Sequence, residues 1–273
     1  MKAWAALVAE PGEGGATRLP VQRSQAPLVL RRTADAVYLV GGAAGPLGGD
    51  VLDLRIDVRD GATLRLRTVA ASVALPGADG RESVLTVTAT VGAGARFEFL
   101  PEPTVVAAGA WHRVEVRVSL AAGAALALRD EVILGRHGER GGSGRMRLRV
   151  DLAGTPLLRH ELDVSGTGEA SLGPAVLAGH RAAGSLLRVE PAWATLPAEE
   201  IAAGYAPGVA VMPLAGPTGG TPGVLVTALA DSALTLRQRL SWLPGRLAQQ
   251  WNPGTAEEAG AAAAMWGGVA LKR

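Results

Sequence analysis

The sequence predicts a mostly β protein, with many strands in a layered or β-helical arrangement and two or three short helices in the C-terminal third. Two observations predict the strands: apolar and polar residues alternate in several segments, and a unit of strand, glycine turn and strand recurs. The helices are predicted by a third observation. Near the end of the chain, glycine, proline and alanine interrupt the alternation, and apolar residues take up helical spacing.

The clearest alternation lies in the segment VLDLRIDV, residues 51–58, where every second residue is apolar and the residues between are charged. Successive side chains of a strand point to opposite faces, so this pattern is typical of a strand with one buried face. The apolar segment 3–9 predicts a first strand. It has only the minimum length of the apolar region of a signal peptide, and acidic, glycine-rich sequence follows at once, so we interpret it as a strand and not as a signal peptide.

Four copies of the strand, turn and strand unit follow one another, and their turn glycines are roughly 30 residues apart. A repeat of this length favours a stacked β structure in which each unit covers the apolar edge of its neighbour. The alternative is four ordinary hairpins in a large antiparallel sandwich. Both arrangements are mostly β. The glycines concerned are Gly61, Gly94, Gly123 and Gly154.

The last third has the signals of helices. Leucines recur at helical spacing in DSALTLRQRLSWL, with Asp231 or Ser232 as the N-cap. We expect short helices around 197–203, 232–243 and 256–266. No boundary is sharp enough to divide the chain, so we expect a single domain over 1–273, strand-rich over 1–195 and mixed, with the helices, over 196–273.

Composition excludes several functional classes. The chain has 27 basic and 25 acidic residues, so it lacks the charge excess that attracts nucleic acid. It has no cysteine, which excludes disulfides and thiolate metal sites and fits a cytoplasmic protein. No apolar run reaches the roughly 18 residues of a membrane-spanning helix. We therefore expect neither a nucleic-acid nor a membrane partner.

The glycine-rich segment VGGAAGPLGGD, residues 40–50, does not fit a nucleotide site. It lacks the lysine and hydroxyl of a P-loop, and an alternating strand follows it where a dinucleotide fingerprint needs a helix. We interpret its glycines as positions of positive φ or of close backbone approach. No two histidines have a spacing that predicts a metal cage. The histidines are His112, His137, His160 and His180.

The densest polar stretch contains Asp130 and Glu131, the carboxylate pair that a β-solenoid enzyme acting on a glycan would need. Adjacent residues of a strand point to opposite faces, so these two enter one cleft only if the strand is bulged. Two functions nevertheless stay open at this stage: a glycan-acting enzyme and a non-catalytic binding module.

Several ordered motifs, which together cover roughly residues 15–165, resemble the UreD (also called UreH) family of urease accessory proteins. A strand runs into a loop that ends in Gly-Gly-Asp; an alternating strand, a Gly-Ala turn, a Thr-x-Ala-Ala segment, a Leu-Pro-x-Pro block and a glycine- and arginine-containing block follow in order. The matching positions are Gly48, Gly49, Asp50, Gly61, Ala62, 68–71, 100–103, Glu131, Gly135, Arg136, Gly138 and Glu139.

The resemblance implies a β-helical scaffold without catalysis. It implies binding to urease apoprotein and to a UreF-like protein, and through UreF to a UreG-like GTPase. It also implies that nickel passes in transit, with no cofactor bound permanently. We expect Asp50 to line an internal polar passage, with Glu131 as the second candidate, because weak oxygen sites release nickel more readily than histidine or thiolate cages. Apolar residues of the C-terminal helical region are expected to form a partner surface: Leu236, Leu240 and Trp242.

Overall fold

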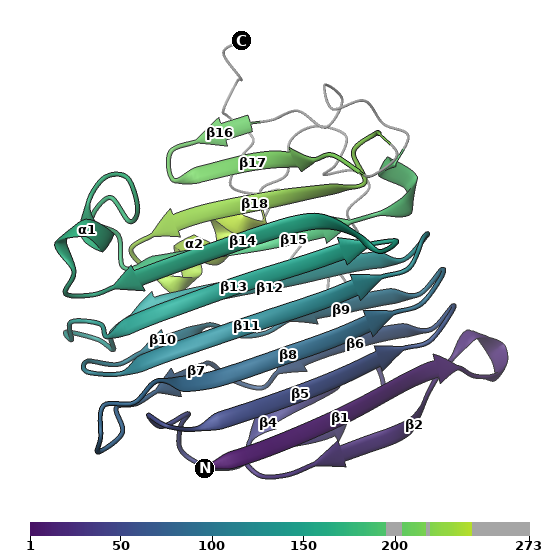
Figure 1. The fold of residues 1–273 in the computed structure, drawn as a ribbon, viewed down its shortest axis with the longest axis horizontal. Helices are drawn as coiled ribbons and strands as arrows, with labels where there is room; N and C mark the ends of the chain where they lie inside the picture. Colours follow the sequence, from purple (N-terminus) through teal and green to yellow (C-terminus); the bar gives the residue numbers. More distant parts are fainter. Residues whose placement is uncertain (195–203, 217–218, 242–273) are drawn as a thin grey trace.

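The computed structural model describes residues 1–194, 204–216 and 219–241, and in it the chain forms two β-sheets that lie face to face (Figure 1). The first sheet has seven strands. Their order from one edge to the other is β14 (Thr155–Ser165), β13 (Ser143–Leu152), β11 (Trp111–Leu120), β8 (Ser83–Val91), β5 (Val51–Val58), β1 (Lys2–Pro11) and β2 (Thr17–Ser24).

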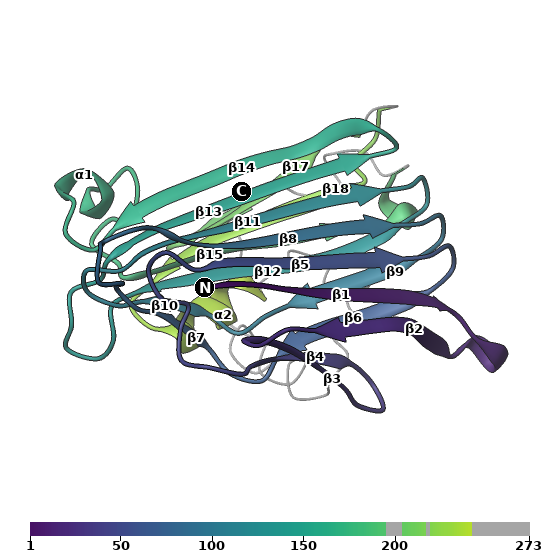
Figure 2. The same ribbon diagram turned by 60° about the horizontal axis from the view of Figure 1, so that its bottom comes forward.

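The second sheet has eleven described strands, and Figure 2 shows it behind the first. Its main order is β16 (Gly204–Ala206), β17 (Val209–Leu214), β18 (Gly223–Ala230), β15 (Ala182–Val189), β12 (Ala125–Leu134), β9 (Arg96–Leu100), β6 (Thr63–Thr68), β4 (Val37–Gly41) and β3 (Leu28–Arg32). Two short strands, β7 (Ser72–Ala74) and β10 (Thr104–Val106), complete the sheet. β10 pairs with β12 on one side and with β7 on the other.

The repeating unit is one turn of a solenoid, called a coil here: a strand in the seven-stranded sheet, a turn, and a strand in the eleven-stranded sheet. The turns after β5, β8 and β11 carry the chain from the seven-stranded sheet to the eleven-stranded sheet, and equivalent strands of successive coils pair in parallel and in register. The glycines of these turns have positive φ, a conformation that glycine adopts without strain. The prediction of a layered β stack is therefore confirmed. The hairpin alternative is wrong for three of the four units and holds only at Gly154, where β13 and β14 pair antiparallel.

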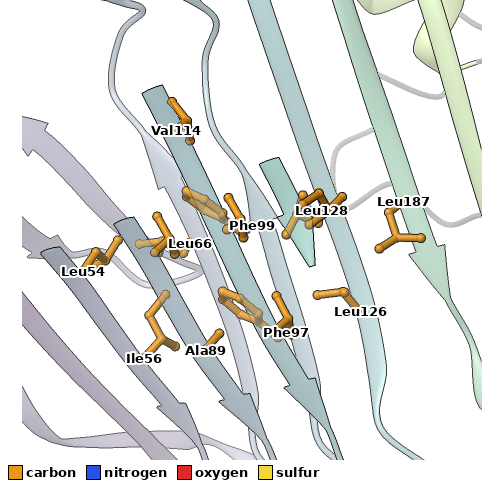
Figure 3. Packing of buried hydrophobic residues seen from close by; sticks show 14 of the residues in the cluster. Leu54, Ile56, Leu66, Ala89, Phe97, Phe99, Val114, Leu126, Leu128 and Leu187 are labelled. Atoms are coloured by element: carbon orange, nitrogen blue, oxygen red, sulfur yellow. The ribbon is translucent and has the colours of Figure 1, made fainter. Parts of the chain in front are cut away.

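The main core lies between the two sheets, because the alternation buries one face of each (Figure 3). The seven-stranded sheet contributes Leu54, Ile56, Ala89 and Val114, among others, while the eleven-stranded sheet contributes Leu66, Phe97, Phe99, Leu126, Leu128 and Leu187. The rings of Phe97 and Phe99 stack with centroids 6.3 Å apart. The apolar faces of both sheets are thus buried against each other, and this burial stabilises the coils in register.

A second, smaller core covers the outer face of the eleven-stranded sheet. Helix α2 (Ala233–Leu240) lies on this face, and the Ser232 side chain caps it by accepting the N–H of Thr235. Ser232 is one of the two predicted caps. Leu236 and Leu240 are buried against Trp193 and strands of the sheet. The expectation that these leucines form a partner surface is corrected: they are core residues of the chain itself.

The other helical segments are short. They are a single-turn helix α1 (Glu169–Leu172) and two 3₁₀ turns, η1 (Glu13–Gly15) and η2 (Pro191–Trp193). The expected helices at 197–203 and 256–266, and Trp242, lie outside the described residues. Over the part of the chain that is described, no helix is long and apolar enough to cross a membrane.

Replacement of Leu240 by Asp should lower the free energy of unfolding by several kcal/mol, because a charge would enter the core under α2. Leu234→Asp is the matched control on the same helix: Leu234 is 70% exposed and Leu240 is 1% exposed. The control should change stability by less than about 0.5 kcal/mol. Denaturant unfolding measures both. A stable, folded Leu240→Asp protein that no longer binds a partner would restore the partner-surface interpretation.

Candidate functional site

The glycine-rich loop before β5 and the Thr-x-Ala-Ala segment meet at one end of the stack, around a hollow of about 430 Å³. The loop 41–46 and the segment 68–73 form its walls, and Thr104 and His112 also line it. Large apolar side chains are exposed at the same end, namely Leu47, Val69 and Trp111. Segments that are far apart in the sequence therefore build a single concave surface.

His112 lines this hollow and is otherwise buried. Its ring Nδ1 lies 2.9 Å from the Ser83 hydroxyl, which also donates to the Trp111 carbonyl at 3.3 Å. Burial lowers the pKa of His112 to about 4, so its ring is neutral near pH 7. Ser83 is fully buried, so this pair orients the imidazole and does not present a nucleophile to solvent.

Asp50 is buried directly behind the loop, and both of its carboxylate oxygens are engaged. One accepts from the Met1 ammonium group, and the other accepts from the Leu47 N–H at 2.9 Å. Burial by itself would raise the pKa of Asp50, but these bonds outweigh it and lower the pKa. Asp50 therefore organises the loop that forms the hollow.

The glycines beside Asp50 allow two backbone segments to touch. A Cβ atom on Gly48 would lie 2.5 Å from the amide nitrogen of Gly77, and Gly49 has a φ of 88°. The block at Gly135 and Arg136 is a turn between β12 and β13. There the Arg136 guanidinium binds both carboxylate oxygens of Glu139, at 2.8 and 2.9 Å. This bonding, above all, lowers the pKa of Glu139 to about 2.

Glu131 lies on the outer face of the eleven-stranded sheet, under α2. Its carboxylate accepts from Arg237 of α2 at 2.7 Å and lies 3.4 Å from the Arg129 guanidinium. Arg237 also donates to Glu102, at 2.9 and 3.0 Å. Glu131 is fully buried, so this network ties the helix to the sheet through charge-assisted hydrogen bonds.

Asp130 points the other way, into the space between the sheets. Its neighbours at alternate positions, Leu128 and Val132, belong to the core between the sheets. Burial, and then the charge of Glu131, raise the pKa of Asp130 to about 7. The two carboxylates are thus separated by their own strand, as alternation predicts. A glycosidase mechanism that uses this pair is excluded, because its carboxyl groups must flank one bond.

A row of polar residues runs from Asp130 across the inner face of the sheet. Ser185 pairs with Asp130 in register, and Thr227 pairs with Ser185. Thr227 lines a cavity of about 620 Å³ at the open end of the stack. His160 of β14 lines the same cavity, and burial lowers its pKa. Polar residues therefore occupy neighbouring register positions on three strands, and the last of them, Thr227, lines the cavity.

The described residues contain no group of three or more histidine, cysteine, aspartate or glutamate residues that could hold a metal ion. The histidines lie on separate segments. His180 pairs with Asp231 at 2.6 Å, and His137 is exposed in the loop after β12. The groups that face inward are therefore single oxygen or nitrogen donors, which bind a metal more weakly than a closed cage does.

Comparison with known proteins identifies the family. The family described as UreD urease accessory protein matches residues 2–262. The chain belongs to the UreD family. It is 46% identical to the urease accessory protein UreD of Parafrankia sp. (strain EAN1pec), over 90% of this chain and 89% of that protein. It is also 46% identical to the UreD of Frankia alni, over 89% and 92%, and 44% identical to that of Streptomyces coelicolor, over 86% and 92%.

Sequence reasoning missed two features of this UreD chain. It treated Asp130 only as a possible partner of Glu131, although alternation from Leu128 to Val132 already indicates that Asp130 faces inward. It could not find Arg237 as the partner of Glu131, because the two lie more than one hundred positions apart. Alternation was thus a signal for Asp130, whereas no signal in the sequence identifies the Arg237 pair.

The stability of this UreD chain should depend on pH through Asp130. Its pKa is raised in the folded state, so the unfolded state binds fewer protons between pH 4 and 7, and stability should fall as pH rises through this range. Asp130→Asn should remove this fall and be more stable than the wild type near pH 7, by a few kcal/mol at most. Denaturant unfolding at a series of pH values measures it. Identical pH profiles for the two proteins would contradict the assignment.

Proposed function

We propose that this chain is a non-catalytic scaffold for urease maturation in the cytoplasm. It binds urease apoprotein and a UreF-like protein, reaches a UreG-like GTPase through UreF, and helps to deliver nickel to urease. The observation that carries the proposal is membership of the UreD family across residues 2–262. The relatives with the same coverage are urease accessory proteins by name.

The architecture supports the scaffold part of the proposal. In-register parallel strands and a continuous core between two sheets give a stiff body. A body of this kind keeps its shape when several partners bind at once. The hollow built by the motif loops and the exposed apolar residues around it offer one such contact region.

Nickel in transit is the cargo of the proposed complex. We infer that inward-facing carboxylates contact it weakly and in sequence, since hard oxygen donors suit brief contacts. Asp50 and Glu131 remain candidates, but each is held by a cation within the described chain, which nickel would have to displace, and Glu131 lies on the outer face of its sheet, under α2. Asp130 meets the requirement more directly. It faces the space between the sheets, in line with Ser185 and the cavity beyond.

Co-expression with urease apoprotein and a UreF-like protein, followed by affinity purification, tests the partner contacts. Specific recovery of both partners with the full chain is expected, together with loss of urease activation when the chain is deleted. Recovery of the chain alone, with urease activated equally well in its absence, would refute the scaffold function.

Nickel loading of urease tests the transit route. Asp130→Asn should slow loading several-fold and leave partner recovery unchanged, because Asn keeps the shape of the side chain but removes the charge. Asp50→Asn and Glu131→Gln are measured in parallel, with unfolding curves for each, because both also break an ion pair. Normal loading by a folded Asp130→Asn protein would remove Asp130 from the route, and the same result for Asp50→Asn would remove Asp50.

A further inference from the structure

The outer face of the seven-stranded sheet carries three arginines side by side. Arg117 of β11 pairs in register with Arg149 of β13, and Arg149 pairs with Arg159 of β14. Residues that are directly opposite on neighbouring strands share a face, and the strands lie about 4.8 Å apart. The three guanidinium groups therefore form one row across three strands, which we call the arginine row.

Like charges directly opposite each other destabilise a sheet. An uncharged residue can occupy this kind of position. Thr88 of β8, which pairs with Arg117 on the same face, is an example, and threonine is well suited to an exposed strand. The arginine row therefore lowers the stability of the free protein. A row that lowers the stability of the free protein is best explained if its arginines stabilise a complex with a bound partner.

The acids around the row hold Arg117 and Arg159 more closely than they hold Arg149. Arg117 donates to Glu115 at 2.9 and 3.1 Å, and Arg159 binds Asp151 and the Val150 carbonyl. Arg149 comes no closer to a carboxylate of the described residues than 4.0 Å, at Glu115. Arg149 is also 51% exposed, so its guanidinium is open to a ligand.

Arg149 is the most distant of the three cations at Glu115. The Glu115 carboxylate is almost fully buried, and it already accepts from Arg117 and, at 3.4 Å, from Arg113. Removal of Arg149 would leave Glu115 with two cations. The row therefore contains a guanidinium whose ion pair within the chain is the longest of the three.

We propose that the arginine row binds an acidic segment of a protein partner, with two or more carboxylates spaced to meet neighbouring guanidinium groups. Guanidinium forks match carboxylates with two parallel hydrogen bonds. The positive row is narrow, because acids border it on both sides, at Glu115 and Asp151. These acids would repel a long polyanion such as a nucleic acid, whereas a short acidic segment fits between them. The identity of the partner rests on the proposed function.

Arg149→Thr tests this inference by two measurements on the full chain. The variant should raise the melting temperature by about 2 °C, because a like-charge contact disappears. It should also bind the acidic partner, urease apoprotein or the UreF-like protein, about tenfold more weakly at low salt, with a smaller dependence on salt. Biosensor titrations against each purified partner at several salt concentrations measure this loss.

Arg55→Thr is the matched control. Arg55 is exposed on the same face, but its cross-strand neighbours are Ala6 and Thr88, so it opposes no like charge. It should change neither the affinity nor the melting temperature appreciably.

Three outcomes would overturn the inference. A lower melting temperature for Arg149→Thr would show that the row is structural. Equal affinities of the wild type and Arg149→Thr for both partners would refute the inference while the scaffold function stands; if the wild type bound neither partner, both would fail. Binding of a duplex DNA or RNA oligonucleotide that Arg149→Thr abolishes would assign the row to nucleic acid instead.

Discussion

The structure depends on one constraint. The two strands of each coil, one in each sheet, must face each other with apolar side chains, and each strand must also pair its backbone with the equivalent strands of the neighbouring coils. Strict alternation satisfies the first requirement, because it buries one face of both sheets in a common core. Parallel, in-register pairing satisfies the second. The length of the coil, set by the turn glycines, keeps both conditions true from β5 through β12.

The same constraint gives neighbouring residues different surroundings. Asp130 and Glu131 are adjacent in sequence, yet one faces the core between the sheets and the other faces helix α2. Glu131 lies within hydrogen-bonding or ion-pair distance of Arg237 and Arg129, whereas burial raises the pKa of Asp130 to about 7. A single strand thus separates a structural ion pair from a carboxyl group that faces the space between the sheets.

The outer faces differ as well. The eleven-stranded sheet is covered by α2 and a second core, while the seven-stranded sheet leaves its charged face uncovered by any described element. Most charges on the open face are paired along or across the strands, including Arg117 and Arg159 of the arginine row, whereas Arg149 comes no closer than 4.0 Å to a carboxylate of the described residues. Together with the hollow of the motif loops, this face gives the body two regions of different chemistry. An accessory protein that meets more than one partner can use such a difference to keep them apart.

The sequence by itself determined which face of each strand is buried, where the chain turns, and that a helix begins at Asp231 or Ser232, because these properties depend on local periodicity and local backbone preference. The motif loops likewise identified the family, and with it the role in urease maturation. Tertiary structure decided that Leu236 and Leu240 are core residues, since an apolar helix face is equally suited to its own sheet and to a partner. It also decided that turns such as the one at Gly61 pass between sheets and form no hairpin. Alternation fixes which face of a strand is buried, but it carries no information about which strand lies beside it.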